Sequence, residues 1–280
     1  MGNVIGLGHR GAAFHAPQNT AASMKKAVEF GIDGIETDVH LTRDGVPVIH
    51  HNYTIDSTSD GSGTISLMTY EELLQYDFGS YKGEEFAGER ILTLPQLLDI
   101  VKDLSVINIE LKAPVKKGPE LVETTLKCVE DAGLADKVIY SSFDAQLLRQ
   151  VREERPGARI GFLTWFEGAS DMLREMPSMF LSSYPVPNAE EILKAFAYEE
   201  KSVAEQVEAL PFAPDYLHPD YRSVLLNPGL VQQMHERGIG VNPYTCDKPE
   251  NMRALIAAGC DAIITNRPDV FLEVVKEVRP

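Results

Sequence analysis

The sequence predicts an α/β fold, a (β/α)₈ barrel with a small insertion after the second strand. Short apolar runs alternate with helical patterns from one end of the 280-residue chain to the other, which is typical of a parallel sheet whose strands are joined by helices. One run follows its predecessor across an Asp44–Gly45 turn and indicates a hairpin. Without this hairpin strand, eight apolar runs remain as predicted strands of the main sheet, which is the number in a (β/α)₈ barrel of about this length. A doubly wound open sheet is the alternative fold.

Nine segments are predicted to be strands. They cover residues 4–9, 34–41, 46–51, 106–112, 138–143, 159–164, 215–221, 239–245 and 262–266. Helical patterns lie between them over residues 19–31, 93–104, 119–133, 144–157, 227–238 and 248–259. Several end in glycine, the residue favoured where helices stop. In the first of them we expect Asn19 or Thr20 as the N-cap and Gly31 at the end.

Two stretches interrupt this alternation. Residues 52–93 are rich in Gly, Ser, Asp and Tyr and are too long for an ordinary loop. We expect them to form an insertion that caps the barrel mouth within a single domain spanning residues 1–280. A second irregular stretch, about 166–214, carries several prolines and a helical segment over 188–210, and Trp165 precedes it.

The charge balance restricts the partners. A net charge of -16 argues against nucleic acid and against steady adhesion to an anionic membrane. It does not exclude a small anionic substrate, because a metal or a local Arg/Lys pair reverses the field inside a cleft. Nothing in the sequence indicates an oligomer.

The cysteines and the N-terminal segment bear on the compartment. Cys128, Cys246 and Cys260 form no CxxC pair, so we expect neither a disulfide framework nor a zinc site. We identify no signal peptide and no run of 18 apolar residues that would span a membrane. The expected location is cytoplasmic.

Charged side chains gather at the ends of three predicted barrel strands, which meet in one cleft. Alternation puts neighbours two residues apart on one face. Packed carboxylates repel each other unless a cation bridges them, and oxygen ligands favour Mg²⁺ or Ca²⁺ over Zn²⁺. The pattern predicts metal-assisted phosphoryl chemistry with a histidine acid or base. The residues are His9 and Arg10, Glu36 and Asp38, and Glu110 and Lys112.

Each of these residues also has a purely structural interpretation. His9 alone is more often structural than catalytic, and Glu36 with Asp38 are equally consistent with a solvated edge strand. Glu110 and Lys112 are equally consistent with a salt bridge. Because all of these residues fall at the strand ends of one predicted barrel, we favour the functional interpretation over the structural one.

The same residues carry a resemblance to the glycerophosphodiester phosphodiesterase (GDPD) family. The matching stretches are HRG (9–11), APQNT (16–20), ETDVHLTRDGVPVIHHNYTID (36–56), TSDGSG (58–63), ERILTLPQLL (89–98), NIELK (108–112), SSF (141–143), HPDY (218–221), NPYT (242–245) and DAIITNRPD (261–269). The resemblance implies a barrel with an insertion, and hydrolysis of small glycerophosphodiesters to sn-glycerol 3-phosphate and an alcohol. It also implies one divalent cation on Glu36, Asp38 and Glu110, with two catalytic histidines.

His51 is predicted as the second catalytic histidine, with His9 the first. The family places this residue thirteen positions after the metal Asp, which is His51 counted from Asp38. Adjacent residues on a strand face opposite sides, so His50 is expected to point into the insertion or into solvent. We assign His9 as base and His51 as acid, and the exchanged assignment stays open.

Other site residues are expected around this centre. Arg10 and Lys112 are expected to bind phosphate, and Phe143 and Tyr244 to form the alcohol side, with core packing as an equal alternative. For His40 we favour packing over a place in the cleft, and we do not expect His218 to reach the barrel mouth. Four residues depart from the family pattern, Asn52 for Asp, Gln18 for Glu, Ser57 for Arg and Tyr244 for Trp.

Three rival functions share parts of this pattern. A lysophospholipase D would use the same site with a more apolar mouth. A non-catalytic phosphate-ester-binding barrel would need neither the carboxylates nor both histidines. A sugar-phosphate isomerase would carry a Gly-rich loop after the last strands, and residues 262–269 supply none.

Overall fold

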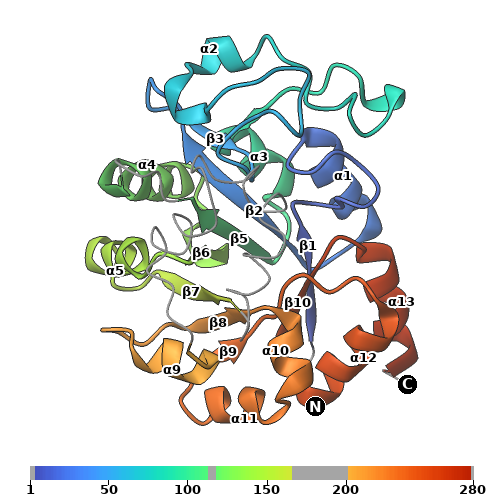
Figure 1. Ribbon diagram of the computed structural model, residues 1–280, viewed down its shortest axis with the longest axis vertical. Coiled ribbons are helices and arrows are strands. Elements are labelled where there is room, and N and C mark those ends of the chain that lie inside the picture. Colours follow the sequence, from blue (N-terminus) through green and yellow to red (C-terminus); the bar gives the residue numbers. More distant parts are fainter. Residues whose placement is uncertain (1–3, 113–117, 166–200, 279–280) are drawn as a thin grey trace.

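A computed structural model describes residues 4–112, 118–165 and 201–278 of the chain. Eight strands lie in the order β10-β1-β2-β5-β6-β7-β8-β9, each pairing in parallel with the next (Figure 1). The strands are β1 (Ile5–His9), β2 (Gly34–Leu41), β5 (Val106–Leu111), β6 (Val138–Ser142), β7 (Arg159–Thr164), β8 (Tyr216–Pro219), β9 (Gly240–Val241) and β10 (Ala262–Thr265). Backbone hydrogen bonds from Asp261 N to Val241 O and from Ile264 N to Pro243 O, both 3.0 Å, connect the two ends of this order. The predicted barrel fold is confirmed.

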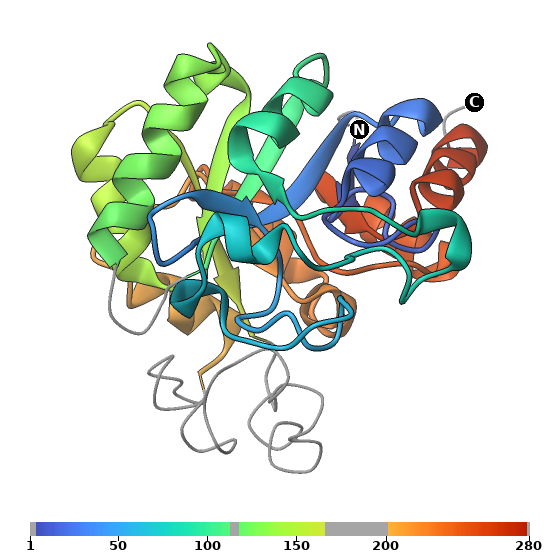
Figure 2. The same ribbon diagram turned by 90° about the horizontal axis from the view of Figure 1, so that it is seen from above.

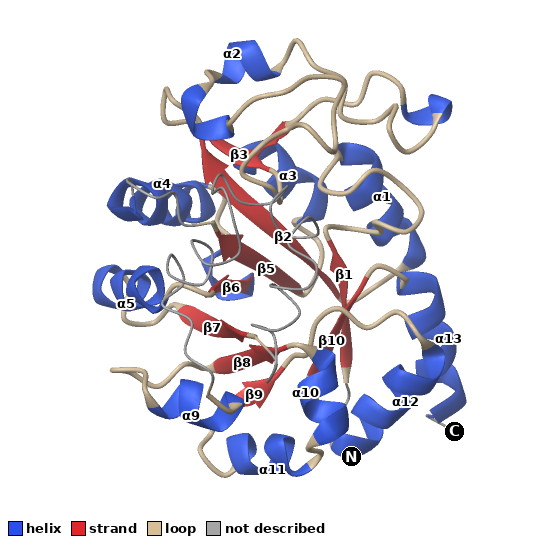
Figure 3. Ribbon diagram, viewed as in Figure 1, coloured by secondary structure: helices blue, strands red, loops and turns tan. Residues whose placement is uncertain are grey.

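Helices surround the strands on the outside (Figure 3). They are α1 (Ala21–Phe30), α3 (Leu94–Val101), α4 (Gly118–Asp131), α5 (Ala145–Glu154), α9 (Val203–Glu208), α10 (Tyr221–Leu226), α11 (Gly229–His235), α12 (Pro249–Ala258) and α13 (Pro268–Val278). The cap of α1 is Thr20, whose side chain accepts a hydrogen bond from Ser23 N, and Gly31 ends the helix at φ 78°. Within the described ranges, no helix combines the length and apolar character needed to cross a membrane.

The predicted hairpin is present. Strand β3 (Pro47–Ile49) pairs antiparallel with β2, from Val39 opposite Ile49 to Leu41 opposite Pro47. Gly45 occupies the turn at φ 80°, a left-handed conformation that glycine adopts without strain. A short strand that the sequence did not predict, β4 (Leu92–Thr93), pairs antiparallel with β3 at the end of the insertion.

The insertion has a hydrophobic cluster of its own. It contains η1 (Ile65–Leu67), α2 (Tyr70–Leu73) and η2 (Glu84–Phe86). Its buried apolar side chains form a cluster with Val48 of β3, separate from the main core, and they are Ile55, Ile65, Leu73, Phe78 and Ile91. Figure 2 shows the insertion, in cyan, from above and nearest the viewer. It contacts the loop after β1, where Lys82 Nζ donates to Ala13 O at 2.9 Å. That it caps the barrel mouth stays a prediction, as does the single-domain boundary at 1–280. The predicted helical segment over 188–210 lies outside the described residues up to position 200, and α9 occupies its last part.

One interior histidine lies deeper than the mouth. His218 on β8 is fully buried, and its Nε2 lies 3.2 Å from Asn242 Nδ2, which donates to it. Gly161 on β7 gives this ring its space, because a Cβ at position 161 would lie 2.7 Å from His218 Nε2.

Replacing Gly161 with alanine is expected to destabilise the fold by about 1–3 kcal/mol, because the added methyl group overpacks the barrel interior. Urea denaturation followed by circular dichroism measures the change. The matched control is Gly157→Ala, whose added Cβ meets no atom within 4 Å. Equal unfolding midpoints for the two variants would show that the His218 ring can move away from the added methyl group without lowering the stability of the fold.

Candidate active site

Three carboxylates from two adjacent strands form a buried cluster at the centre of the barrel. Glu36 and Asp38 alternate on β2, and Glu110 on β5 lies opposite Asp38 in the parallel register. One oxygen from each residue lies within 4.8 Å of the others, and all three residues are buried. The period-2 alternation of the strands therefore brings the predicted ligand set together.

Two cationic side chains border this cluster. Lys112 Nζ lies 3.0 Å from Asp38 Oδ1 and 2.7 Å from Glu110 Oε1. Arg10 Nε lies 3.5 Å from Asp38 Oδ2, and the Arg10 backbone N donates to Glu36 Oε2 at 3.2 Å. Both predicted phosphate-binding cations thus lie against the carboxylates.

The electrostatics of the cluster favour an additional cation. Burial raises the pKa of Glu36 well above its usual value, and the charge of Asp38 raises it further. Burial likewise raises the pKa of Glu110 to about 7, with Lys112 opposing the change and Asp38 adding to it. For Asp38 burial acts upward, but the charges of Lys112, His51 and Arg10 outweigh it and lower the pKa. An oxygen-only donor set of this kind fits a hard divalent cation.

His9 lies at the edge of the cluster. Its Nε2 is 3.7 Å from Glu36 Oε2, and its Nδ1 lies 2.7 Å from Asn266 Oδ1. Burial, together with the positive charge of Arg10, lowers the pKa of His9 to about 3. A neutral imidazole of this kind has a lone pair available to accept a proton.

The two neighbouring histidines follow the end of β3 at Ile49, and they take different surroundings. The Nδ1 of His51 donates to Asn52 Oδ1 at 2.6 Å, and His51 interacts electrostatically with Asp38 of the cluster. His50 instead is buried in the insertion, where its Nδ1 donates to Asn52 O at 2.8 Å and its Nε2 accepts from Thr58 Oγ1 at 2.7 Å. Of the two expected positions for His50, the insertion is the observed one.

His40 packs behind His51. It is buried and edge-on to Tyr53, with ring centroids 5.0 Å apart, and its Nε2 donates to His51 O at 3.3 Å. The favoured packing interpretation of His40 matches this placement, and the residue also holds the backbone of His51.

Two departures from the family pattern contact each other. Asn52 Nδ2 donates to Ser57 Oγ at 2.8 Å, while Asn52 Oδ1 accepts from His51. The support of His51 is therefore a neutral amide and hydroxyl pair. A third departure, Gln18, accepts a hydrogen bond from Arg10 Nη1.

Aromatic side chains gather at the carboxyl ends of β6, β7 and β9. The Phe143 and Trp165 rings lie 4.8 Å apart at 30°, and the Tyr244 ring is 6.1 Å from Phe143 and nearly perpendicular to it. Tyr244 Oη donates to Thr164 O at 2.9 Å. Both predicted wall residues thus lie in one aromatic group, to which Trp165 adds a third ring.

Sequence reasoning did not assign site roles to two asparagines. Asn19, at φ 60° after β1, donates from Nδ2 to Asp38 Oδ2 at 2.8 Å and accepts from Thr37 Oγ1 at 2.9 Å. Asn266 contacts His9 from the far end of the chain. Their signal was their place in the APQNT and DAIITNRPD stretches, Asn19 at the start of the first predicted helix and Asn266 as the last residue of the ninth predicted strand.

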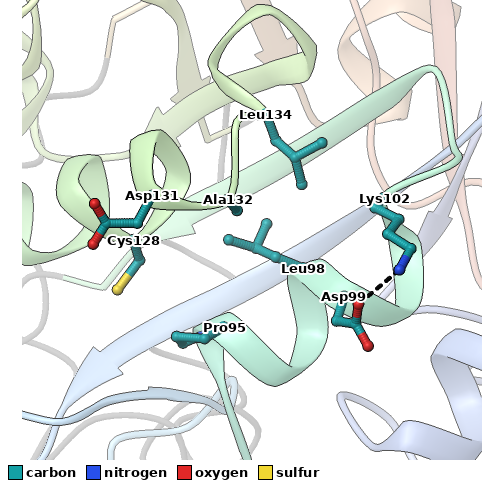
Figure 4. A pocket seen from close by; sticks show the side chains of 8 residues that line it. All are labelled: Pro95, Leu98, Asp99, Lys102, Cys128, Asp131, Ala132 and Leu134. Atoms are coloured by element: carbon teal, nitrogen blue, oxygen red, sulfur yellow. Dashed lines mark hydrogen bonds and ion pairs between the residues drawn. The ribbon is translucent and has the colours of Figure 1, made fainter.

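A separate pocket of about 350 Å³ lies on the outer surface between α3 and α4 (Figure 4). It contains none of the predicted site residues. Its lining residues are Pro95, Leu98, Asp99, Lys102, Cys128, Asp131, Ala132 and Leu134. The chemistry therefore belongs to the cluster at the strand ends and not to this groove.

Similarity to known proteins identifies the family of this chain. The model of the glycerophosphoryl diester phosphodiesterase family matches residues 9–270. The chain belongs to this family. A glycerophosphodiester phosphodiesterase of Caldanaerobacter subterraneus subsp. tengcongensis is 33% identical over 272 residues, which cover 97% of each chain. Membership of the family makes the chain a phosphoric diester hydrolase.

Solved structures share the fold of this family member. A phosphodiesterase of Oleispira antarctica, in complex with the product sn-glycerol-3-phosphate, has a TM-score of 0.77 at 24% identity, covering 97% of this chain and 96% of that one. A glycerophosphodiester phosphodiesterase of Thermotoga maritima has a TM-score of 0.68 at 25% identity, with coverages of 98% and 99%. The fold of the chain thus occurs in structures of this enzyme class.

Proposed function

We propose that the chain hydrolyses glycerophosphodiesters to sn-glycerol 3-phosphate and an alcohol, using Mg²⁺ or Ca²⁺ held by Glu36, Asp38 and Glu110. The observation that carries this proposal is the buried carboxylate cluster beside His9 and two cations. The product complex of the Oleispira antarctica relative supports the same products. When bound, the cation supplies positive charge for a phosphate oxygen and for the charge that develops in the transition state.

In the proposed mechanism, the two cationic side chains bind the phosphate and the two histidines transfer protons. Arg10 and Lys112 add positive charge on the same side and orient the phosphate. His9 accepts the proton of the attacking water through Nε2, as the oxygen of that water bonds to phosphorus. The bond from phosphorus to the alcohol oxygen breaks, and that oxygen takes a proton from His51 Nε2, so His51 enters this step as the imidazolium with its Nδ1–H on Asn52 Oδ1. Burial and the charges of Arg10 and Lys112 lower the pKa of His51, and the negative charge of the bound phosphate opposes them. Attack by the glycerol hydroxyl of the substrate, with His9 as its base, would give a cyclic phosphate in place of direct hydrolysis.

The alcohol leaves toward the aromatic group of Phe143, Trp165 and Tyr244. These rings offer apolar faces to a head group, and the near-perpendicular rings of Phe143 and Tyr244 bound it on two sides. The alternative is that a larger lipid group binds beside these rings, in which case the enzyme would be a lysophospholipase D.

A substrate panel tests the function. Purified protein with Mg²⁺ or Ca²⁺ is expected to release sn-glycerol 3-phosphate from glycerophosphocholine, glycerophosphoethanolamine and glycerophosphoinositol, measured with a coupled dehydrogenase. The head groups rank by how well the aromatic group accommodates them.

Lysophosphatidylcholine is the discriminating substrate in that panel. Faster turnover of it, with lysophosphatidic acid as product, would replace the proposal by a lysophospholipase D. Binding of glycerophosphodiesters without turnover of any substrate would leave only a phosphate-ester-binding barrel.

A further inference from the structure

His9 is held by a side chain from the last strand of the barrel. Asn266 directly follows β10, and β10 pairs in parallel with β1, where Gly8 lies opposite Thr265. The next residue on each strand is therefore His9 and Asn266, and their side chains meet at 2.7 Å. Closure of the barrel creates this contact between residues 257 positions apart.

A carboxylate behind Asn266 dictates which way its amide faces. Asp247, in the loop between β9 and α12, accepts from Asn266 Nδ2 and from the Asn266 backbone N, both at 2.8 Å. It also accepts from Thr265 Oγ1 at 3.0 Å. A carboxylate offers only acceptors, so the amide nitrogen must face Asp247 and Oδ1 must face His9.

The tautomer of His9 follows from that orientation. Oδ1 of Asn266 can only accept, so the Nδ1 of His9 carries the hydrogen and donates it. The Nε2 atom is then left with its lone pair, on the side of Glu36. This is the nitrogen that the proposed function uses to take a proton.

The loop that carries Asp247 is fixed to β10, because Cys246 N donates to Ile264 O at 3.0 Å. This backbone bond holds Asp247 in place behind Asn266.

We propose that Asp247 is a positioning residue, which acts through Asn266 to fix the ring and tautomer of His9. This inference rests on the proposed function, in which His9 accepts a proton through Nε2. Asp247 contacts neither substrate nor cation in this role. It sets the direction of the hydrogen bond between Asn266 and His9, as the outer partners of functional histidines commonly do.

A charge exchange between the two residues tests the proposal. Asp247→Asn allows both amides to turn, which presents an N–H group to His9 and reverses its tautomer. Asn266→Asp sets two carboxylates 2.8 Å apart. Each single variant is expected to lower kcat by about 10- to 100-fold with KM within about twofold. The double variant Asp247→Asn/Asn266→Asp reverses the bond between the two side chains, because the new amide donates to the new carboxylate, but it again presents only an acceptor to His9 Nδ1. The kcat of the double variant is expected to recover to within about fivefold of the original.

The matched control is Asp261→Asn at the opposite end of β10. Asp261 also accepts from a histidine, His235 Nε2 at 2.8 Å, and from the backbone N of Val241 at 2.7 Å, but it lies away from the cluster. Its kcat is expected to be unchanged. Additive losses in the double variant, or equal losses in the Asp261→Asn control, would overturn the positioning role.

A ring ¹⁵N NMR spectrum of His9 gives a readout independent of turnover. The unsubstituted protein is expected to show a protonated Nδ1 and an unprotonated Nε2, with the two exchanged in Asp247→Asn. An Nε2-protonated ring in the unsubstituted protein overturns the inference, and it does so even if Asp247→Asn fails to fold. Full activity of His9→Ala would instead remove the proposed function, so the two failures are distinguishable.

Discussion

Replacing His51 with alanine is expected to lower kcat on glycerophosphocholine by about 10²- to 10⁴-fold, the usual contribution of a general acid or base. The reason is that the variant lacks the proton donor that the proposed mechanism assigns to the leaving alkoxide. His51 Nδ1 is already engaged by Asn52 Oδ1, so only its Nε2 faces the reaction. Steady-state kinetics at saturating cation measure the change, and KM is expected to move little.

His50→Ala is the matched control, one residue away. It removes bonds to Asn52 O and Thr58 Oγ1 inside the insertion. We expect a loss of about 1–3 kcal/mol in the free energy of unfolding but a kcat within about tenfold of the original protein. A kcat loss in His50→Ala as large as that in His51→Ala would mean that the wrong histidine has been assigned to the site.

Replacing Glu36 with glutamine is expected to raise the cation concentration needed for half-maximal activity by at least about 100-fold. The change keeps the size of the side chain and removes one of the three charged oxygen ligands at the cluster. Protein treated with EDTA is expected to lose turnover and to regain it on addition of Mg²⁺ or Ca²⁺. Titration of the chelated protein with each ion, followed by activity and by calorimetry, measures both effects.

Asp33→Asn is the control for the removal of a charge from the same strand segment. Asp33 directly precedes β2 and accepts from Gly6 N at 2.8 Å, at the opposite end from the cluster. Its cation requirement is expected to be unchanged. Turnover that survives EDTA in the unsubstituted protein, with an unaltered cation requirement in Glu36→Gln, would remove the metal from the proposed function.

The alternation of the sequence was enough to predict the carboxylate cluster. Glu36 and Asp38 share a face because strand side chains repeat every two residues, and the same rule pairs Glu110 with Lys112, whose Nζ and Oε1 lie 2.7 Å apart. The glycine and turn residues likewise predicted the hairpin between β2 and β3. These features depend on neighbours a few residues apart, and such relations are local in the sequence.

The supports of the histidines were not predictable in this way. The Asn52–Ser57 bond joins two residues that each seemed an isolated departure from the family pattern. The burial of His50 depends on how residues 52–93 fold around their own hydrophobic cluster. The strand β4 has two residues, too few to show a period.

The sequence by itself determined the strand alternation and the ligand types, because each is a property of a short segment. The count of thirteen residues from Asp38, which predicts His51 as the second catalytic histidine, came from the resemblance to the family. Only the tertiary structure decided that Asn266 meets His9 and that Asp247 orients it. Closure of the barrel places the last strand beside the first. The direction of a hydrogen bond is set by partners that the chain brings together only in space.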